Sequence, residues 1–330
     1  MILFWVGVLA LTTLLYVLLD GFDLGVGILF GFAGDEAYRK RMLATISPVW
    51  DGNETWLVLT ATILFGAFPR IYATLLSAFY LPLILMLGAL ILRGVAFEFR
   101  HNAADGWRWI WDVSFAGGSL VATFIQGVTI GALAAGLPMQ EGHYAGGTWG
   151  WFSPFACLCG VGLCLGYALL GAGWLVAKGE GVLRERAYAV LPGLAAGVFG
   201  FLAIAFVYAL VLNLRIMDRW LERPYLIVFP AIGAWAAFQL VRGIQSHDDL
   251  RPFRMTALIF GSAFATLAAS FWPFMIPFAV TIDEAVAPAA SLDFMFWGAG
   301  LVVLPLTLGY TAVVYRVFRG KVADTGGHYE

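Results

Sequence analysis

Charged residues are scarce in this sequence. Only 12% of its 330 residues are Asp, Glu, Lys or Arg, whereas 61% are hydrophobic. An average soluble domain has about 25% charged residues, and so few charges could not cover the surface of a soluble fold of this size. The apolar runs are continuous rather than alternating, which excludes a transmembrane β-barrel and predicts an all-α membrane protein.

Other absences exclude further classes of protein. A net charge of −2 provides no basic surface for nucleic acid. The three cysteines lie in one apolar run, without the pairing or spacing of a disulfide framework or a metal site, and are interpreted as packing residues. All histidines fall in predicted connections or in the tail, so we expect this chain to bind no haem and no metal by itself. They are His101, His143, His247 and His328.

Long apolar runs are the dominant feature of the sequence. A membrane-spanning helix needs about 20 mainly apolar residues, and nine segments qualify, although the second is short and is expected to begin before Glu54. The nine predicted transmembrane helices are 2–31, 54–68, 74–97, 109–136, 150–177, 189–213, 226–243, 256–278 and 292–318.

Lysine and arginine are distributed unequally between the two sets of predicted connections. One set, with the C-terminal tail, holds fourteen of them, whereas the other holds four. Cytoplasmic loops carry the excess of positive residues. The sequence therefore predicts a multi-pass protein with a periplasmic N-terminus and a cytoplasmic C-terminus.

Polar residues inside the apolar runs are the most informative feature. Asp20 and Asp23 lie three residues apart in the first predicted span and share a helix face. Asp51 and Glu54 share a face in the same way near the start of the second span, with Asn53 between them. On the predicted topology all of them lie toward the cytoplasmic side, so we expect their side chains to converge there.

Three more ionisable residues extend this group. Arg93 and Glu98 end the third span and are predicted to form supporting ion pairs, and Asp112 opens the fourth span. A charged Asp at a helix centre costs about 2.5–3.5 kcal/mol, and keeping it protonated at pH 7 costs about 4 kcal/mol. Because the two costs are similar, such a group suits a proton relay. The alternative is a structural ion-pair network, in which Asp51 caps the second helix with Glu54 as the third-position acid.

Several of these segments resemble a known family. The segments 20–27 (DGFDLGVG) and 48–56 (PVWDGNETW) resemble two signatures of subunit II of cytochrome bd-type quinol oxidases, a family that includes the cyanide-insensitive oxidases. The likeness continues in chain order at 68–69 (FP), 93–100 (RGVAFEFR), 126–128 (QGV), 153–156 (SPFA), 171–175 (GAGWL), 272–277 (WPFMIP) and 289–291 (AAS).

The resemblance implies a subunit of a terminal oxidase in the bacterial cytoplasmic (inner) membrane, which oxidises quinol and reduces oxygen to water. It implies two four-helix bundles, here 1–136 and 150–278, with a peripheral helix at 292–318 and a cytoplasmic tail at 319–330. Haems b and d, or a variant of haem d, are expected in the partner, subunit I. Some members also hold a structural quinone in subunit II, and a small accessory subunit and bound lipids are compatible with the resemblance.

The resemblance also assigns a role to particular residues. Asp20 and Asp51 match acids that help to carry cytoplasmic protons toward the oxygen-reducing haem of the partner subunit. Asp23, Asn53 and Glu54 are added to this predicted proton pathway because of their position. Two alternatives remain: a proton-coupled secondary transporter that uses the same acids, and a purely structural scaffold for the haem subunit.

Overall fold

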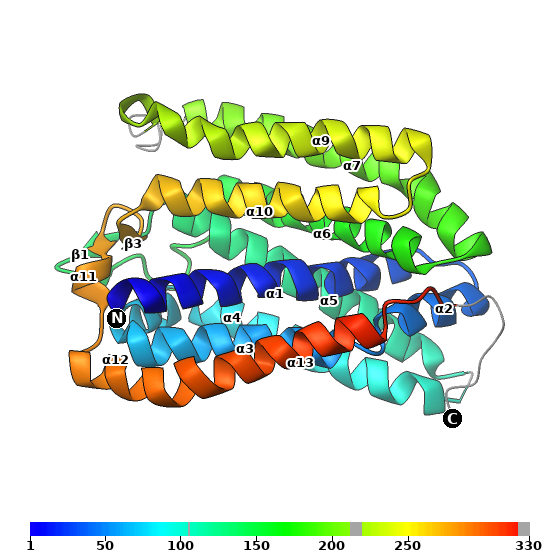
Figure 1. The fold of residues 1–330 in the computed structure, drawn as a ribbon, viewed down its shortest axis with the longest axis horizontal. Coiled ribbons are helices and arrows are strands. Elements are labelled where there is room, and N and C mark those ends of the chain that lie inside the picture. Colours follow the sequence, from blue (N-terminus) through cyan, green and yellow to red (C-terminus); the bar gives the residue numbers. More distant parts are fainter. Residues whose placement is uncertain (105, 212–219, 323–330) are drawn as a thin grey trace.

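The computed structural model describes residues 1–104, 106–211 and 220–322. Its long helices run roughly along one common axis (Figure 1). Among the described residues, eight helices are long and apolar enough to cross a membrane. A further helix of 18 residues, α3, has a polar first turn and runs in the same direction (Figure 1).

The helices overlap the predicted spans, although the last two residues of the span 189–213, and the tail from residue 323, lie outside the described residues. They are α1 (Ile2–Phe30), α2 (Glu36–Ile46), α3 (Trp50–Ala67), α4 (Pro69–Phe99), α5 (Arg108–Ala135), α6 (Pro154–Lys178), α7 (Gly181–Val211), α9 (Val228–Ser246), α10 (Arg251–Phe271), α11 (Ile282–Ala285), α12 (Ala289–Met295) and α13 (Leu304–Val317). A π-helical segment, Phe296–Val303, joins α12 to α13, and two 3-10 turns, η1 (Arg100–Asn102) and η2 (Pro224–Ile227), precede or follow helices.

Two short antiparallel hairpins connect helices at one end of the molecule. They are formed by β1 (Met139–Gln140) with β2 (His143–Tyr144), and by β3 (Phe274–Ile276) with β4 (Val280–Thr281). The N-terminus, these hairpins and α11 lie at this end, whereas α2 lies at the opposite end (Figure 1). We call the opposite end the α2 end.

The structure corrects two local predictions and adds a helix between the first two predicted spans. The predicted span 256–278 ends at Phe271, and residues 274–276 form a strand instead, because Pro273 has no N–H with which to continue a helix. The connection 32–53 contains α2, a short charged helix. The capping interpretation is wrong as well: α3 begins at Trp50 after the apolar Val49, so Asp51 lies in its first turn instead of capping it.

Helix α1 occupies the centre of the molecule. It contacts α3, α5, α6 and α10, and Figure 1 shows it between α3 on one side and α6 and α10 on the other. Every residue from Asp20 to Ile28 is buried. The part of the chain with the first predicted acids is therefore the part that lies deepest in the protein.

Glycines allow α1 and α6 to approach each other at this depth. A Cβ atom on Gly25 would lie 1.8 Å from the backbone oxygen of Tyr167, and one on Gly171 would lie 2.5 Å from the backbone of Gly25. A Cβ on Gly21 would meet the Tyr167 ring at 2.7 Å. Small residues permit such close approach of helices in membranes. The contact fixes the position of α1 along α6.

We expect Gly25→Ala to disrupt the contact between α1 and α6, because the added methyl group would overlap backbone atoms that cannot move aside. Overpacking of this kind typically costs about 1–3 kcal/mol. The measurement is the yield and thermal midpoint of the purified protein. Gly7→Ala on the same helix is the matched control, because the described residues leave open space there. Equal stability of the two variants would contradict the close contact.

Candidate functional site: a buried acid cluster

Five of the residues singled out in the sequence come together inside the protein. Asp20 and Asp23 project from α1, Asn53 and Glu54 from α3, and Arg93 from α4. Glu54 is partly exposed, and the other four are buried. We call these five residues the acid cluster. It contains three carboxyl groups and one guanidinium group.

Arg93 lies at the centre of the acid cluster. Its Nη1 atom forms an ion pair with Glu54 and lies 3.6 Å from Oδ1 of Asp20. The guanidinium carbon is 5.9 Å from the ring centroids of both Trp50 and Phe115, so aromatic faces cover it. Its Nε and Nη2 atoms are buried and donate no hydrogen bond to any described residue. One cation therefore balances more than one carboxyl group.

A hydrogen-bonded chain reaches Asp23 from another direction. Asn53 Nδ2 donates to Asp23 Oδ2 at 2.6 Å and to the backbone oxygen of Leu19 at 3.2 Å. The hydroxyl of Tyr315, on α13, donates to Asn53 Oδ1 at 3.0 Å. A helix close to the C-terminus thus contributes to the surroundings of the cluster.

Sequence reasoning missed a polar group on the N-terminal side of the cluster. Tyr16 lies one helical turn before Asp20, and its hydroxyl accepts a hydrogen bond from Gln126 Nε2 at 2.7 Å. Gln126 Oε1 accepts from the Tyr167 hydroxyl at 3.2 Å. The Tyr16 hydroxyl also lies close to the Asp20 carboxyl group, which has no other hydrogen-bond partner among the described residues. The available signal was spacing, because Thr12, Tyr16 and Asp20 recur every four residues on one face of α1.

Two predicted site residues lie outside the acid cluster. Asp51 is exposed on the first turn of α3, three residues before Glu54 of the acid cluster. Glu98 is exposed on α4, and no ion pair joins it to Arg93 or to another residue within the described ranges. The partners of Arg93 are Glu54 and Asp20 instead.

Asp112 belongs to a separate ion-pair network at the α2 end. It pairs with Arg39 of α2 at 2.6 Å and with Arg100 at 2.5 Å. Arg100 also binds Glu36 at 2.6 Å, and Arg108 lies 3.8 Å from the same carboxylate. These pairs attach α2 to the ends of α4 and α5, which is a structural role.

Two carboxylates at the start of α2 make the stability of this helix depend on pH. The backbone N–H of Tyr38, and then Arg186, lower the pKa of Asp35. Partial burial alone would raise the pKa of Glu36, but the hydrogen bond and charge of Arg100 hold it below its usual value. A lowered pKa in the folded state stabilises α2 above the usual pKa, and this stabilisation is lost as the pH falls through the lowered value.

We therefore expect α2 to loosen in acid, at pH values near and below the usual carboxylate pKa. Hydrogen exchange of the α2 amides, corrected for the intrinsic rate at each pH, provides the measurement. Exchange should become faster as the pH falls, whereas the buried amides of α1 serve as an internal control. A variant with Asp35→Asn and Glu36→Gln should exchange faster at neutral pH and respond less to acid. An unchanged pH response in that variant would contradict the assignment.

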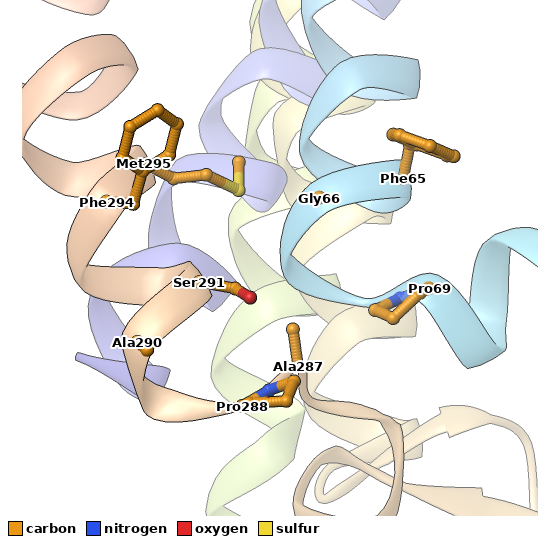
Figure 2. A pocket seen from close by; sticks show the side chains of 9 residues that line it. All are labelled: Phe65, Gly66, Pro69, Ala287, Pro288, Ala290, Ser291, Phe294 and Met295. Carbon is orange, nitrogen blue, oxygen red and sulfur yellow. The ribbon is translucent and has the colours of Figure 1, made fainter.

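An apolar pocket lies far from the acid cluster, at the other end of α3. Its volume is about 530 Å³, and it is bounded by the end of α3 and by α12 (Figure 2). Ser291 provides the only hydroxyl group among its lining residues, which are Phe65, Gly66, Pro69, Ala287, Pro288, Ala290, Ser291, Phe294 and Met295. The pocket contains no titratable group, so it does not contribute to the chemistry of the cluster.

The described histidines lie near helix ends or in connections. His101 lies in η1, His143 in β2 and His247 at the C-cap of α9, so none of them lies in the middle of a described membrane helix. His328 falls outside the described residues. In the described part of the chain, no three His, Cys, Asp or Glu side chains are grouped in a way that could hold a metal ion.

The described residues thus combine eight helices that are apolar and long enough to cross a membrane with a group of acids that is largely buried, which are the features of a polytopic membrane protein with an internal ionisable site. The sequence profile described as "Cytochrome bd terminal oxidase subunit II" matches residues 1–318. The chain belongs to this family, which confirms the resemblance seen in the sequence. Membership identifies it as a subunit of a cytochrome bd oxidase and implies a subunit I partner that holds haems.

Curated relatives and a solved structure agree with this family. The chain is 31% identical to the "Probable cytochrome oxidase subunit 2" of Haemophilus influenzae, over 92% of this chain and 90% of the relative. It is 29% identical to "Cytochrome bd-I ubiquinol oxidase subunit 2" of Escherichia coli K12, with the same coverage. It is 30% identical to "Cytochrome bd ubiquinol oxidase subunit 2" of Bacillus subtilis, over 97% and 96%.

A chain of the bd oxidase from Geobacillus thermodenitrificans has the same fold. The two chains superpose with a TM-score of 0.78 over 96% of this chain and 98% of that one, at 18% sequence identity. The apolar helices and the family together indicate a multi-pass protein of the bacterial cytoplasmic membrane.

Proposed function

We propose that this chain is a haem-free subunit II of a quinol-oxidising terminal oxidase and that its acid cluster carries cytoplasmic protons toward the haem subunit. Reduction of oxygen to water consumes protons as well as electrons, so a membrane-embedded oxygen site needs a path for protons. The observation that carries the proposal is a group of three carboxyl groups, two of them buried and one partly exposed, close to a single buried guanidinium.

The charge balance of the cluster supports a role in proton transfer. If Asp20, Asp23 and Glu54 were all ionised, Arg93 would neutralise only one of the three negative charges. Uncompensated charge at membrane depth is costly, and binding of protons removes that cost. Binding of protons therefore lowers the uncompensated negative charge of the cluster. A proton relay requires groups that bind protons in this way.

The order of the residues gives the relay a direction. Asp51 is exposed, Glu54 is partly exposed, and Asp20 and Asp23 are buried deeper along α1. In the proposed path a proton passes from Asp51 to Glu54 and then to Asp20 or Asp23, while Arg93 holds the carboxyl groups together. Buried oxygens such as those of Asp20 are commonly reached by ordered water, which would complete the path.

We extend the proposal to the topology. Counting α3 as a spanning helix would give nine spans among the described residues. We include α3 because its polar first turn lies beside the buried acids rather than in lipid. Helices α1, α3, α4 and α5 would form one four-helix group, α6, α7, α9 and α10 the second, and α12 to α13 the peripheral helix. The α2 end, rich in arginine and lysine, would face the cytoplasm, which places the N-terminus in the periplasm.

The experiment that tests the proposed function is Asp20→Asn in the oxidase assembled with its haem subunit. Oxygen consumption, proton uptake and haem content are measured on the same preparation. Slow turnover with full haem content supports the relay. Loss of haem would instead support the purely structural scaffold, and normal turnover would contradict the relay.

A further inference from the structure

We propose that Tyr315 of α13 is a positioning residue for the acid cluster: its hydroxyl group sets the orientation of the Asn53 amide, and Asn53 in turn fixes Asp23. The inference rests on the proposed proton-transfer function of Asp23. It gives the peripheral helix a role in the chemistry of the site in addition to its packing.

The hydrogen bonds determine which way the Asn53 amide points. Its nitrogen faces two acceptors, Asp23 Oδ2 at 2.6 Å and the Leu19 carbonyl at 3.2 Å. Its oxygen faces the Tyr315 hydroxyl, which donates at 3.0 Å. A flipped amide would place its oxygen against two other oxygens, and an amide oxygen is an acceptor only. The Tyr315 hydroxyl adds to this preference because it supplies the donor that the Asn53 oxygen needs.

Asp23 depends strongly on this one amide. Oδ2 of Asp23 accepts from Asn53, whereas the buried Oδ1 has no hydrogen-bond partner among the described residues. Loss of the Tyr315 hydroxyl would leave the Asn53 oxygen without a donor and remove one of the three hydrogen bonds that hold the amide. A less restrained amide would donate to Asp23 in a poorer geometry and allow its carboxyl group to shift.

The position of Tyr315 on α13 is unusual for that helix. No residue of α13 is fully buried among those described, and most of its large side chains are exposed. Tyr315 is half-buried, and its ring lies 6.5 Å from the Phe22 ring and 6.2 Å from the Trp174 ring. Phe22 and Trp174 are themselves stacked, with centroids 4.1 Å apart. A rigid aromatic surface therefore holds the phenol in place.

Polar contacts also fix the end of α13 next to Tyr315. The Lys178 ammonium group donates to the backbone oxygens of Phe318 and Gly320. Lys321 forms an ion pair with Asp249 at 2.7 Å. These contacts join the segment that directly follows α13 to the end of α6 and to the connection before α10, which restrains the part of α13 that presents the Tyr315 hydroxyl to Asn53.

The test is Tyr315→Phe in the assembled oxidase, which removes the hydroxyl group and keeps the ring. We expect turnover per haem to fall about fivefold, the equivalent of one neutral hydrogen bond. Tyr310→Phe is the matched control, because Tyr310 lies on the same helix, is 60% exposed and is expected to leave the rate unchanged. Equal rates for Tyr315→Phe and the wild type would overturn the proposal.

A double-variant cycle shows whether Tyr315 acts through Asn53. In an Asn53→Ala background, Tyr315→Phe should have no further effect, because the amide that it orients is gone. A full fivefold effect in that background would overturn the proposal. Infrared difference spectra give a second readout: the carboxyl band that Asp23→Asn removes should shift in Tyr315→Phe and stay in place in Tyr310→Phe. An unshifted band would likewise overturn it.

Asp20→Asn, measured in parallel, separates this inference from the proposed function. Normal turnover in Asp20→Asn would refute the proposed proton relay itself. Slow turnover in Asp20→Asn together with a wild-type rate in Tyr315→Phe would leave the relay standing and refute only the positioning role of Tyr315.

Discussion

Asp20→Asn is expected to slow oxygen reduction on the order of a hundredfold, at the lower end of what a positioned proton-transfer group contributes. Asparagine has nearly the same shape as aspartate but cannot take up and release a proton near neutral pH. Asp20 is fully buried and lies 3.6 Å from Arg93, so the substitution removes a carboxyl group from the centre of the cluster. Oxygen consumption and proton uptake per haem are the measurements.

The control for this variant is Asp293→Asn, an exposed acid on α12 at the other end of the molecule. It should leave turnover and haem content unchanged. A wild-type rate in Asp20→Asn with full haem content would refute a relay through this residue. A parallel loss of haem and activity would show that Asp20 acts on assembly.

The second large effect is expected for Arg93→Leu. Removal of one partner from a buried ion pair typically costs about 3–5 kcal/mol, because the remaining charge is left unpaired. Arg93 is fully buried and faces both Glu54 and Asp20, so its loss would leave three carboxyl groups without a nearby cation. We expect a strongly reduced yield of assembled oxidase and a lower thermal midpoint of haem absorbance.

Compensating substitutions test the reason for this loss. If electrostatic imbalance is the cause, adding Asp20→Asn and Glu54→Gln to Arg93→Leu should restore part of the stability, without restoring turnover. Arg254→Leu, at an exposed position of α10, is the control and should assemble normally. No recovery in the triple variant would indicate that Arg93 stabilises the fold through packing against Trp50 and Phe115 rather than through its charge.

The sequence predicted much of the acid cluster because polar residues are rare in apolar segments. Asp20, Asp23, Asn53, Glu54 and Arg93 stand out against their neighbours, and the helix period placed them near one face and one depth. A shared depth predicted that these residues would lie near one another, but the helix face decided which of them meet, since Asp51 and Glu98 are exposed. Only the resemblance to a known family identified the chain as an oxidase subunit, because no physical pattern in this chain indicates that activity.

The hydrogen-bond partners of the cluster could not be predicted in the same way. Tyr16, Gln126, Tyr167 and Tyr315 come from helices far apart in the sequence, and their contacts depend on which helices pack against α1. Tyrosine in an apolar run usually serves as a packing residue, so its presence alone carries no signal. The direction in which the Glu98 side chain points could not be predicted from its closeness to Arg93 in the sequence. This side chain lies on the exposed side of α4.

The uneven placement of the acids along α1 has an electrical consequence. Asp20 lies ten residues before the end of α1 at Phe30, about 15 Å along the helix axis. The membrane voltage acts on a proton at about 2.3 kcal/mol per 100 mV for a complete crossing. A proton that enters from the α2 end and stops at Asp20 crosses only part of this drop. If protons follow the proposed path, loading of the cluster would therefore respond to voltage more weakly than a full crossing would.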